Sequence, residues 1–154
     1  MKYILSFLLI FSSSAFASDY KLEKVISGLT KPWGMSFIND DELFLTQKTG
    51  EILKINIRTQ EIINYEHDLK VVSPHWQAGM LDILYHNKEI FVSYTELRDN
   101  DQTSTSIARG VIDGNKFKTI ENIFQSEPPL WDNLHWGSRL MIKDNLLYLS
   151  LIHI

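Results

Sequence analysis

Short runs of alternating apolar and polar residues, each broken by a polar turn, follow one another along most of the chain. In three segments a first apolar run ends at a polar turn, and a second run rich in Leu, Ile, Phe, Val and Tyr ends in Thr or Ser. This pattern predicts consecutive β-hairpins. The segments are GMSFINDDELFLT from Gly34, GMLDILYHNKEIFVSY from Gly79 and GSRLMIKDNLLYLSL from Gly137.

Further strands are predicted between these hairpins. EILKINIRTQEIINYE has a polar turn at residues 58–60, and TSTSIARGVIDGNKFKTIENIF has one at residues 113–115. Each repeat of roughly 40 to 50 residues therefore holds about four strands, which is typical of a β-propeller blade, whereas a β-sandwich would show no such repeated unit. We expect an all-β fold, a β-propeller, with no helical stripe between Asp19 and Ile154.

The number of blades is small for this fold. Propellers close a ring from about four blades upward, and the sequence has material for about the first two to three. We therefore expect either the N-terminal fragment of a propeller or a chain that pairs with copies of itself, because an open ring leaves strand edges exposed.

The first 17 residues have the composition of a secretory signal peptide. A basic start at Lys2 precedes an apolar run from Tyr3 to Phe11, and a small-x-small triplet ends at Ala17. A transmembrane anchor is the alternative, but the apolar run is shorter than the roughly 20 residues that cross a bilayer. We expect residues 1–17 to be removed, residues 18–154 to form the propeller part, and the product to be periplasmic or secreted with no integral membrane segment.

The charge and cysteine content exclude some classes of protein. The formal net charge is −4 and becomes −5 once Lys2 is removed, which argues against a nucleic-acid partner. The chain has no cysteine, so an exported form cannot use disulfides. The common zinc, thiol, serine-hydrolase and phosphate-loop motifs are absent from the sequence. The loop RDNDQT has the opening spacing of a calcium loop but not its glycine and glutamate, so we interpret it as a solvated turn.

Two polar residues precede successive hairpins. His135 lies two residues before Gly137, and Gln77 lies two residues before Gly79. In a ring of blades such positions converge on the central axis, and a glycine lets a ligand approach the backbone closely. From spacing alone, a histidine beside a tryptophan is more often a packed residue than a catalytic base.

Six segments in order resemble one protein family. They are GLTKPWGMSFINDDELFLTQKTGEILKIN, WQAGMLDI, FVSYTE, TSIARGVI, IFQSEP and LHWGSRLMI. Together they resemble the N-terminal part of the glucose/sorbosone dehydrogenases, which are exported aldose dehydrogenases that use pyrroloquinoline quinone (PQQ). The resemblance extends from about Ile26 to Leu151.

The resemblance implies a six-bladed propeller that binds PQQ on its top face and uses calcium at the cofactor and at the subunit interface. His135 corresponds to the family's general base, which takes the proton of the anomeric hydroxyl while hydride moves from C1 of the aldose to PQQ. Gln77 corresponds to a glutamine that contacts the cofactor. Arg139 is a candidate for a cofactor carboxylate, with a structural ion pair as its alternative. Trp76 and Trp136 could stack on a flat ligand but more commonly pack between blades, so we do not include them.

Two departures from the family limit these expectations. The family continues at this point into a turn of the cofactor pocket, whereas this sequence has Ile152, His153 and Ile154. We do not count these three residues as part of the family pattern or of the natural sequence. The later blades, which carry the family's calcium ligands, are missing, so no metal residue is assigned. We expect this chain alone to be an inactive fragment.

Three functions remain open from the sequence. The leading one is PQQ-dependent oxidation of an aldose to a lactone with an external electron acceptor, with a homodimer as the candidate assembly. The alternative is a non-catalytic propeller that binds carbohydrate or protein. A metal-dependent lactonase ranks last, because the sequence shows no acidic cluster for its ion.

Overall fold

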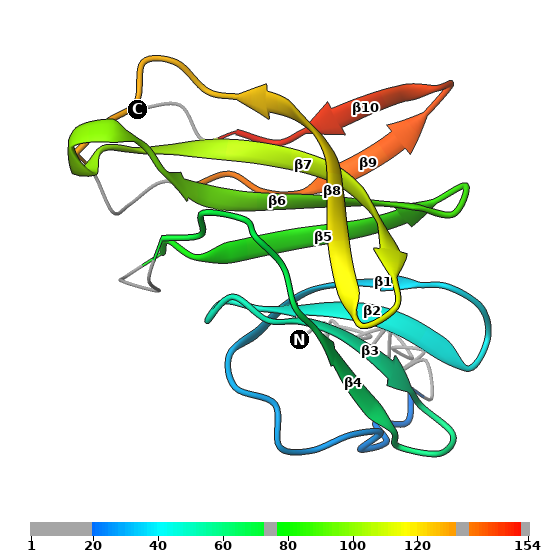
Figure 1. Ribbon diagram of the computed structural model, residues 1–154. Helices are drawn as coiled ribbons and strands as arrows, with labels where there is room; N and C mark the ends of the chain where they lie inside the picture. Colours follow the sequence, from blue (N-terminus) through cyan, green and yellow to red (C-terminus); the bar gives the residue numbers. More distant parts are fainter. Residues whose placement is uncertain (1–19, 73–76, 132–135, 152–154) are drawn as a thin grey trace, which may run out of the picture.

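The computed structural model describes residues 20–72, 77–131 and 136–151, which form three antiparallel β-sheets (Figure 1). In the first two sheets four strands pair in chain order, and the third is a single hairpin. The first strands of successive sheets contact one another. This arrangement confirms the predicted all-β propeller fold, with two complete blades and the first hairpin of a third.

The strand bounds follow the predicted runs closely. The first blade contains β1 (Pro32–Phe37), β2 (Glu42–Gln47), β3 (Ile52–Asn56) and β4 (Ile62–Tyr65). The second blade contains β5 (Met80–His86), β6 (Glu89–Leu97), β7 (Thr103–Asp113) and β8 (Lys116–Gln125). The third hairpin contains β9 (Leu140–Lys143) and β10 (Leu146–Leu149). The predicted solvated turn is a short 3₁₀ turn, η1 (Asp99–Asp101), with exposed side chains.

Tight polar turns connect the first two strands of the second and third blades. Asn87 and Lys88 join β5 to β6 with φ values of 51° and 69°, and Asp144 and Asn145 join β9 to β10 with 52° and 58°. Two consecutive residues with positive φ form the type of two-residue turn that matches the twist of antiparallel strands. The polar turns at these places therefore set the register of both hairpins.

An apolar core lies between the first two blades. Its fully buried members include Ile52 from the first blade and Ile83 from the second, and burial of an aliphatic side chain of this size contributes about 1.5–3 kcal/mol to stability. Among the described residues, the buried members of this core are Phe44, Ile52, Tyr65, Met80, Ile83, Ile90, Val92 and Phe117. A second cluster packs the β9–β10 hairpin against the second blade through Phe91, Ile107 and Leu140.

The segment before β1 packs on the first blade. Ile26 and Leu29 contact a cluster of four buried side chains, which are Leu43, Leu45, Leu53 and Ile55. Within the described ranges there is no long apolar helix of the kind that could cross a bilayer.

The connection from the first blade to the second runs along the second sheet. The backbone of Glu66 pairs with the start of β8, where the Phe117 N–H donates to the Glu66 carbonyl at 2.8 Å. Farther on, the Val72 N–H donates to the Thr95 carbonyl of β6 at 2.9 Å. This connection holds the two blades together at both the outer strand and the inner part of the sheet, and it leads to Gln77 and β5.

Candidate functional site

The first strands of the two complete blades contain the same irregularity. In β1, Trp33 and Gly34 both lie opposite Thr46 of β2, and in β5 two residues, Leu81 and Asp82, lie opposite one residue of β6. An extra residue of this kind is a β-bulge, which bends the strand and re-aims its side chains. Both bulges lie near the start of the first strand of their blade, and in the second blade the predicted site residue Gln77 comes shortly before that strand.

A hydroxyl fixes each bulge in the same way. The Gly34 N–H donates to Thr46 Oγ1 at 3.1 Å, and the Asp82 N–H donates to Ser93 Oγ at 2.9 Å. In the third hairpin the Arg139 N–H donates to Ser150 Oγ at 3.0 Å. Gly34, Asp82 and Arg139 therefore occupy equivalent positions in three successive blades.

The glycine that begins each repeat predicts one alignment of the repeats, and the strand register shows that this alignment is wrong. Gly34 is equivalent to Asp82 and not to Gly79, because the strand pairing of β1 with β2 and of β5 with β6 aligns Gly34 with Asp82. The apolar pattern could not reveal this, since a bulge shifts the pairing by one residue without changing which residues are apolar.

Gly79 has a different role from Gly34. Its φ is 132°, and a Cβ atom there would lie 2.2 Å from the Lys48 carbonyl oxygen, so only glycine fits. The same carbonyl accepts a hydrogen bond from the Met80 N–H at 3.2 Å. Gly79 thus allows the β2–β3 turn to close on the start of β5, and Gln77, two residues before it, is exposed.

Lys48 is a functional candidate that the sequence analysis missed. It is buried at the end of β2, and its Nζ lies 5.0 Å from the centre of the Trp33 ring. Burial, with a smaller contribution from the positive charge of Lys31, lowers the pKa of Lys48. A lysine directly after an apolar strand is typical of a solvated position, so the apolar pattern did not predict a buried cation.

Three innermost strands meet through polar contacts. We call the group formed by Trp33, Gly34, Asp82, Ser138 and Arg139 the hub. The Trp33 indole N–H donates to Ser138 Oγ at 3.5 Å, which links the first blade to the third. Arg139 Nη1 lies 3.3 Å from Asp82 Oδ1, which links the third blade to the second. The sequence offers one signal for Asp82, namely a carboxylate inside an otherwise apolar strand.

Arg139 is the predicted site residue that the structure places within the hub. Its side chain is 71% exposed, although one guanidinium nitrogen contacts Asp82. The predicted contact with a cofactor stays a prediction, and the ion pair with Asp82 is the structural role considered as its alternative. His135 and Trp76 lie outside the described residues. Trp136 is half buried, and its indole nitrogen has no hydrogen-bond partner in the structure.

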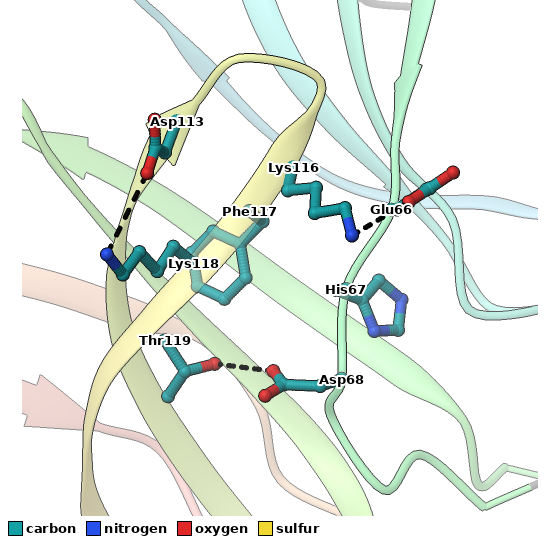
Figure 2. A pocket seen from close by; sticks show the side chains of 8 residues that line it. All are labelled: Glu66, His67, Asp68, Asp113, Lys116, Phe117, Lys118 and Thr119. Carbon is teal, nitrogen blue, oxygen red and sulfur yellow. Dashed lines mark hydrogen bonds and ion pairs between the residues drawn. The ribbon is translucent and has the colours of Figure 1, made fainter.

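A pocket of about 490 Å³ lies away from the hub, between the connection after β4 and the start of β8 (Figure 2). Its polar side chains mostly pair with one another: Lys116 with Glu66, Lys118 with Asp113, and Thr119 with Asp68. No predicted site residue among the described ones lines it. In the part of the chain that the structure describes, no cluster of three or more histidine or acidic side chains could hold a metal ion.

Comparison with known proteins identifies the family. The profile of the glucose/sorbosone dehydrogenases matches residues 29–152. The chain belongs to this family. It is also 30% identical over 145 residues to an uncharacterized protein of Synechocystis sp., an alignment that covers 86% of this chain and 35% of that protein.

Solved structures of the glucose/sorbosone dehydrogenase type share the fold of this family member. A glucose dehydrogenase superposes with a TM-score of 0.74 at 19% identity, over 84% of this chain and 40% of that one. The apo form of a soluble aldose sugar dehydrogenase from Escherichia coli gives 0.65 at 24%, over 79% and 37%. A PQQ-bound aldose sugar dehydrogenase from Streptomyces coelicolor gives 0.70 at 21%, over 84% and 40%. The chain thus spans about 35–40% of the length of these relatives.

Proposed function

We propose that this chain is the part of a PQQ-dependent aldose dehydrogenase that carries the general base and part of the cofactor site. The reaction is oxidation of an aldose at C1 to a lactone. The observation that carries the proposal is the exposed guanidinium of Arg139 at the hub of a chain that belongs to the glucose/sorbosone dehydrogenases.

The described residues have donors that fit an anionic quinone. Arg139 contacts Asp82 through one nitrogen, and the remaining N–H groups of its exposed guanidinium suit a carboxylate. Gln77 has an exposed amide at the start of the neighbouring blade. The buried indole nitrogen of Trp136 has no hydrogen-bond partner, so a carbonyl or carboxylate acceptor nearby would satisfy it. When bound, PQQ supplies the acceptor for the hydride of the sugar.

His135 has the catalytic role in this proposal. It removes the proton from the anomeric hydroxyl as general base, an assignment that comes from its place in the motif LHWGSRL. Its neighbour in the chain, Trp136, leads directly into the hub at Ser138 and Arg139. The hub contacts therefore hold the backbone that follows His135.

The remaining parts of the proposal concern calcium, location and partners. Calcium ligands are expected in the length of the relatives that this chain does not cover. The signal-peptide-like composition of residues 1–17 supports the proposal of a periplasmic or secreted protein with an external electron acceptor. A homodimer is proposed from the resemblance alone, which implies calcium at a subunit interface.

The test is sugar-dependent turnover in a version of the protein that spans the full length of its relatives. After reconstitution with PQQ and calcium, reduction of an artificial electron acceptor is followed with aldoses as substrates. We expect His135→Ala to reduce kcat by at least about 100-fold, the lower end of what general-base catalysis contributes, while Lys116→Ala in the outer pocket leaves it unchanged. Full activity of His135→Ala would show that the assigned base is wrong.

A further inference from the structure

Asp82 connects the second blade to three consecutive residues of the third. Its Oδ2 accepts a hydrogen bond from the Leu140 N–H at 2.9 Å, and its Oδ1 lies 3.3 Å from Arg139 Nη1. Ser93, which accepts the Asp82 N–H, donates its own hydroxyl to the Ser138 carbonyl at 2.8 Å. The side chain of Asp82 thus contacts the segment that contains Arg139 directly, and the backbone N–H of Asp82 is linked to the same segment through Ser93.

The first blade closes the other side of this carboxylate. A Cβ atom on Gly34 would lie 2.6 Å from Asp82 Oδ1 and 2.7 Å from its Cα, so the two strands touch without room for a side chain. Because Gly34 and Asp82 are equivalent positions of two bulges, the missing side chain in one blade makes the space for the carboxylate of the next. The Asp82 side chain is consequently only 5% exposed.

The two ends of the Asp82–Arg139 pair differ strongly in exposure. The carboxylate is fixed by burial and by a backbone N–H, whereas the Arg139 side chain is 71% exposed. A long exposed arginine normally loses much rotational freedom when it binds a ligand. An anchor on one nitrogen restricts the guanidinium in advance and leaves its other N–H groups accessible.

We infer that Asp82 is a positioning residue that holds the guanidinium of Arg139 ready for a carboxylate group of an anionic ligand bound at the hub. The inference rests on the proposed function for the identity of that ligand, PQQ. Asp82 itself does not touch the ligand. It acts through the fixed direction of Arg139 and through the backbone of Leu140.

The alternative role for Asp82 is to neutralise the positive charge of Arg139, and this role predicts an effect of the opposite sign on anion binding. If Asp82 only neutralised Arg139, removal of its charge would strengthen the binding of an anion. If Asp82 positions Arg139, the same removal weakens binding. The substitution Asp82→Asn distinguishes the two, because the amide oxygen can still accept the Leu140 N–H while the charge is lost.

The first measurement is the order of the Arg139 side chain in the 154-residue chain without ligand. We expect a clearly positive ¹⁵N–¹H heteronuclear NOE at Nε of Arg139, and a fall toward the value of a freely rotating side chain in Asp82→Asn. Asp41→Asn, which removes a carboxylate that pairs with the exposed Arg58, is the matched control and should leave Arg139 unchanged. A mobile Arg139 in the unsubstituted chain would overturn the inference without any variant.

The second measurement is the affinity for PQQ of the version that spans the full length of the relatives, followed by quenching of tryptophan fluorescence. We expect Asp82→Asn and Arg139→Ala each to weaken binding roughly tenfold, which corresponds to about 1.4 kcal/mol, and the double variant to be no weaker than Arg139→Ala alone. Equal or tighter binding by Asp82→Asn would overturn the inference. If the version that spans the full length of the relatives takes up no PQQ, the proposed function fails, and the order of Arg139 in the 154-residue chain still decides whether Asp82 positions it.

Discussion

The bulges of β1 and β5 have the same backbone pairing and the same hydroxyl contact, yet they differ in the residue at their centre. The first blade has Gly34 there and the second has the buried carboxylate of Asp82. The repeated backbone therefore sets where a side chain can reach the hub, and the residue at each repeat sets what it does. Gly34 leaves space for the carboxylate of Asp82, and Asp82 holds one nitrogen of the Arg139 guanidinium. Arg139, at the third equivalent position, is exposed to solvent.

The largest effect should come from filling the space at Gly34. In Gly34→Ala the new methyl group would meet the Cα of Asp82 and the backbone nitrogen of Ile83, at 2.7 and 2.9 Å, and backbone cannot move aside cheaply. We expect a loss of about 3 kcal/mol in the free energy of unfolding, measured by urea denaturation.

The control for this substitution is Gly114→Ala. Gly114 has a φ of 62° and no atoms near its Cβ position, so it reports backbone strain without a clash. Gly114→Ala should lower the free energy of unfolding by about 1 kcal/mol. Equal losses in the two variants would mean that the close contact between β1 and β5 does not exist.

Removing the carboxylate of the second bulge should have the next largest effect. Asp82→Ala leaves the buried Leu140 N–H without its acceptor, and an unsatisfied buried donor costs about 1–3 kcal/mol. Asp82→Asn should cost less, because its amide oxygen can accept the same hydrogen bond. Arg139→Ala should cost least, since that side chain is mostly in solvent. A different order in urea denaturation would contradict the assigned roles.

The hydroxyl of Ser93 offers a smaller test of the same bulge. Ser93→Ala removes an acceptor for Asp82 and a donor to the Ser138 carbonyl, for an expected loss of about 1 kcal/mol or somewhat more. Amide hydrogen exchange should speed up at Asp82 and Leu140 in this variant. Unchanged protection at both amides would argue against Ser93 as a link between the second and third blades.

The smallest effect at neutral pH is expected at Tyr94, on β6 of the second blade. Burial, followed by the negative charges of Glu96 and Asp68, raises the pKa of Tyr94. The unfolded chain ionises near about pH 10, so the stability that neutral Tyr94 provides is complete below that pH and is lost as the pH rises further.

Tyr94→Phe should therefore flatten the fall of Tm between pH 9.5 and 11.5, a range set around the ordinary tyrosine pKa of about 10. Tyr148→Phe is the control, since Tyr148 is 45% exposed. An equally steep fall in Tyr94→Phe and the unsubstituted chain would mean that Tyr94 ionises as easily in the folded state as in the unfolded one.

The strands and hairpins could be predicted because their causes are local. Alternating apolar residues define β5 and β6, and the polar turn at Asn87 and Lys88 adopts the positive φ values that a two-residue hairpin needs. The division into blades followed from the repeat of these units along the sequence. The order of the family motifs also indicated Gln77, His135 and Arg139 as site residues, and these assignments stay predictions.

The hub could be predicted only in part because its contacts join residues far apart in the chain. Asp82 meets Arg139 and Leu140 through a bulge that the apolar pattern does not encode. Lys48 is buried because Trp33 and the start of β5 lie over it, and both belong to other strands. The glycines that begin the repeats predicted one alignment of the blades, and the observed strand pairing shows a different one.

The central claim is that the hub, together with Gln77, forms part of the cofactor site, and PQQ titration of the version that spans the full length of the relatives tests it most directly. The account predicts saturable binding that is weakened by Gln77→Ala and Arg139→Ala, and unchanged by Lys116→Ala in the outer pocket, whose side chain is also charged but lies away from the hub. Binding that is unaffected by Gln77→Ala and Arg139→Ala, or that depends on Lys116, would contradict it.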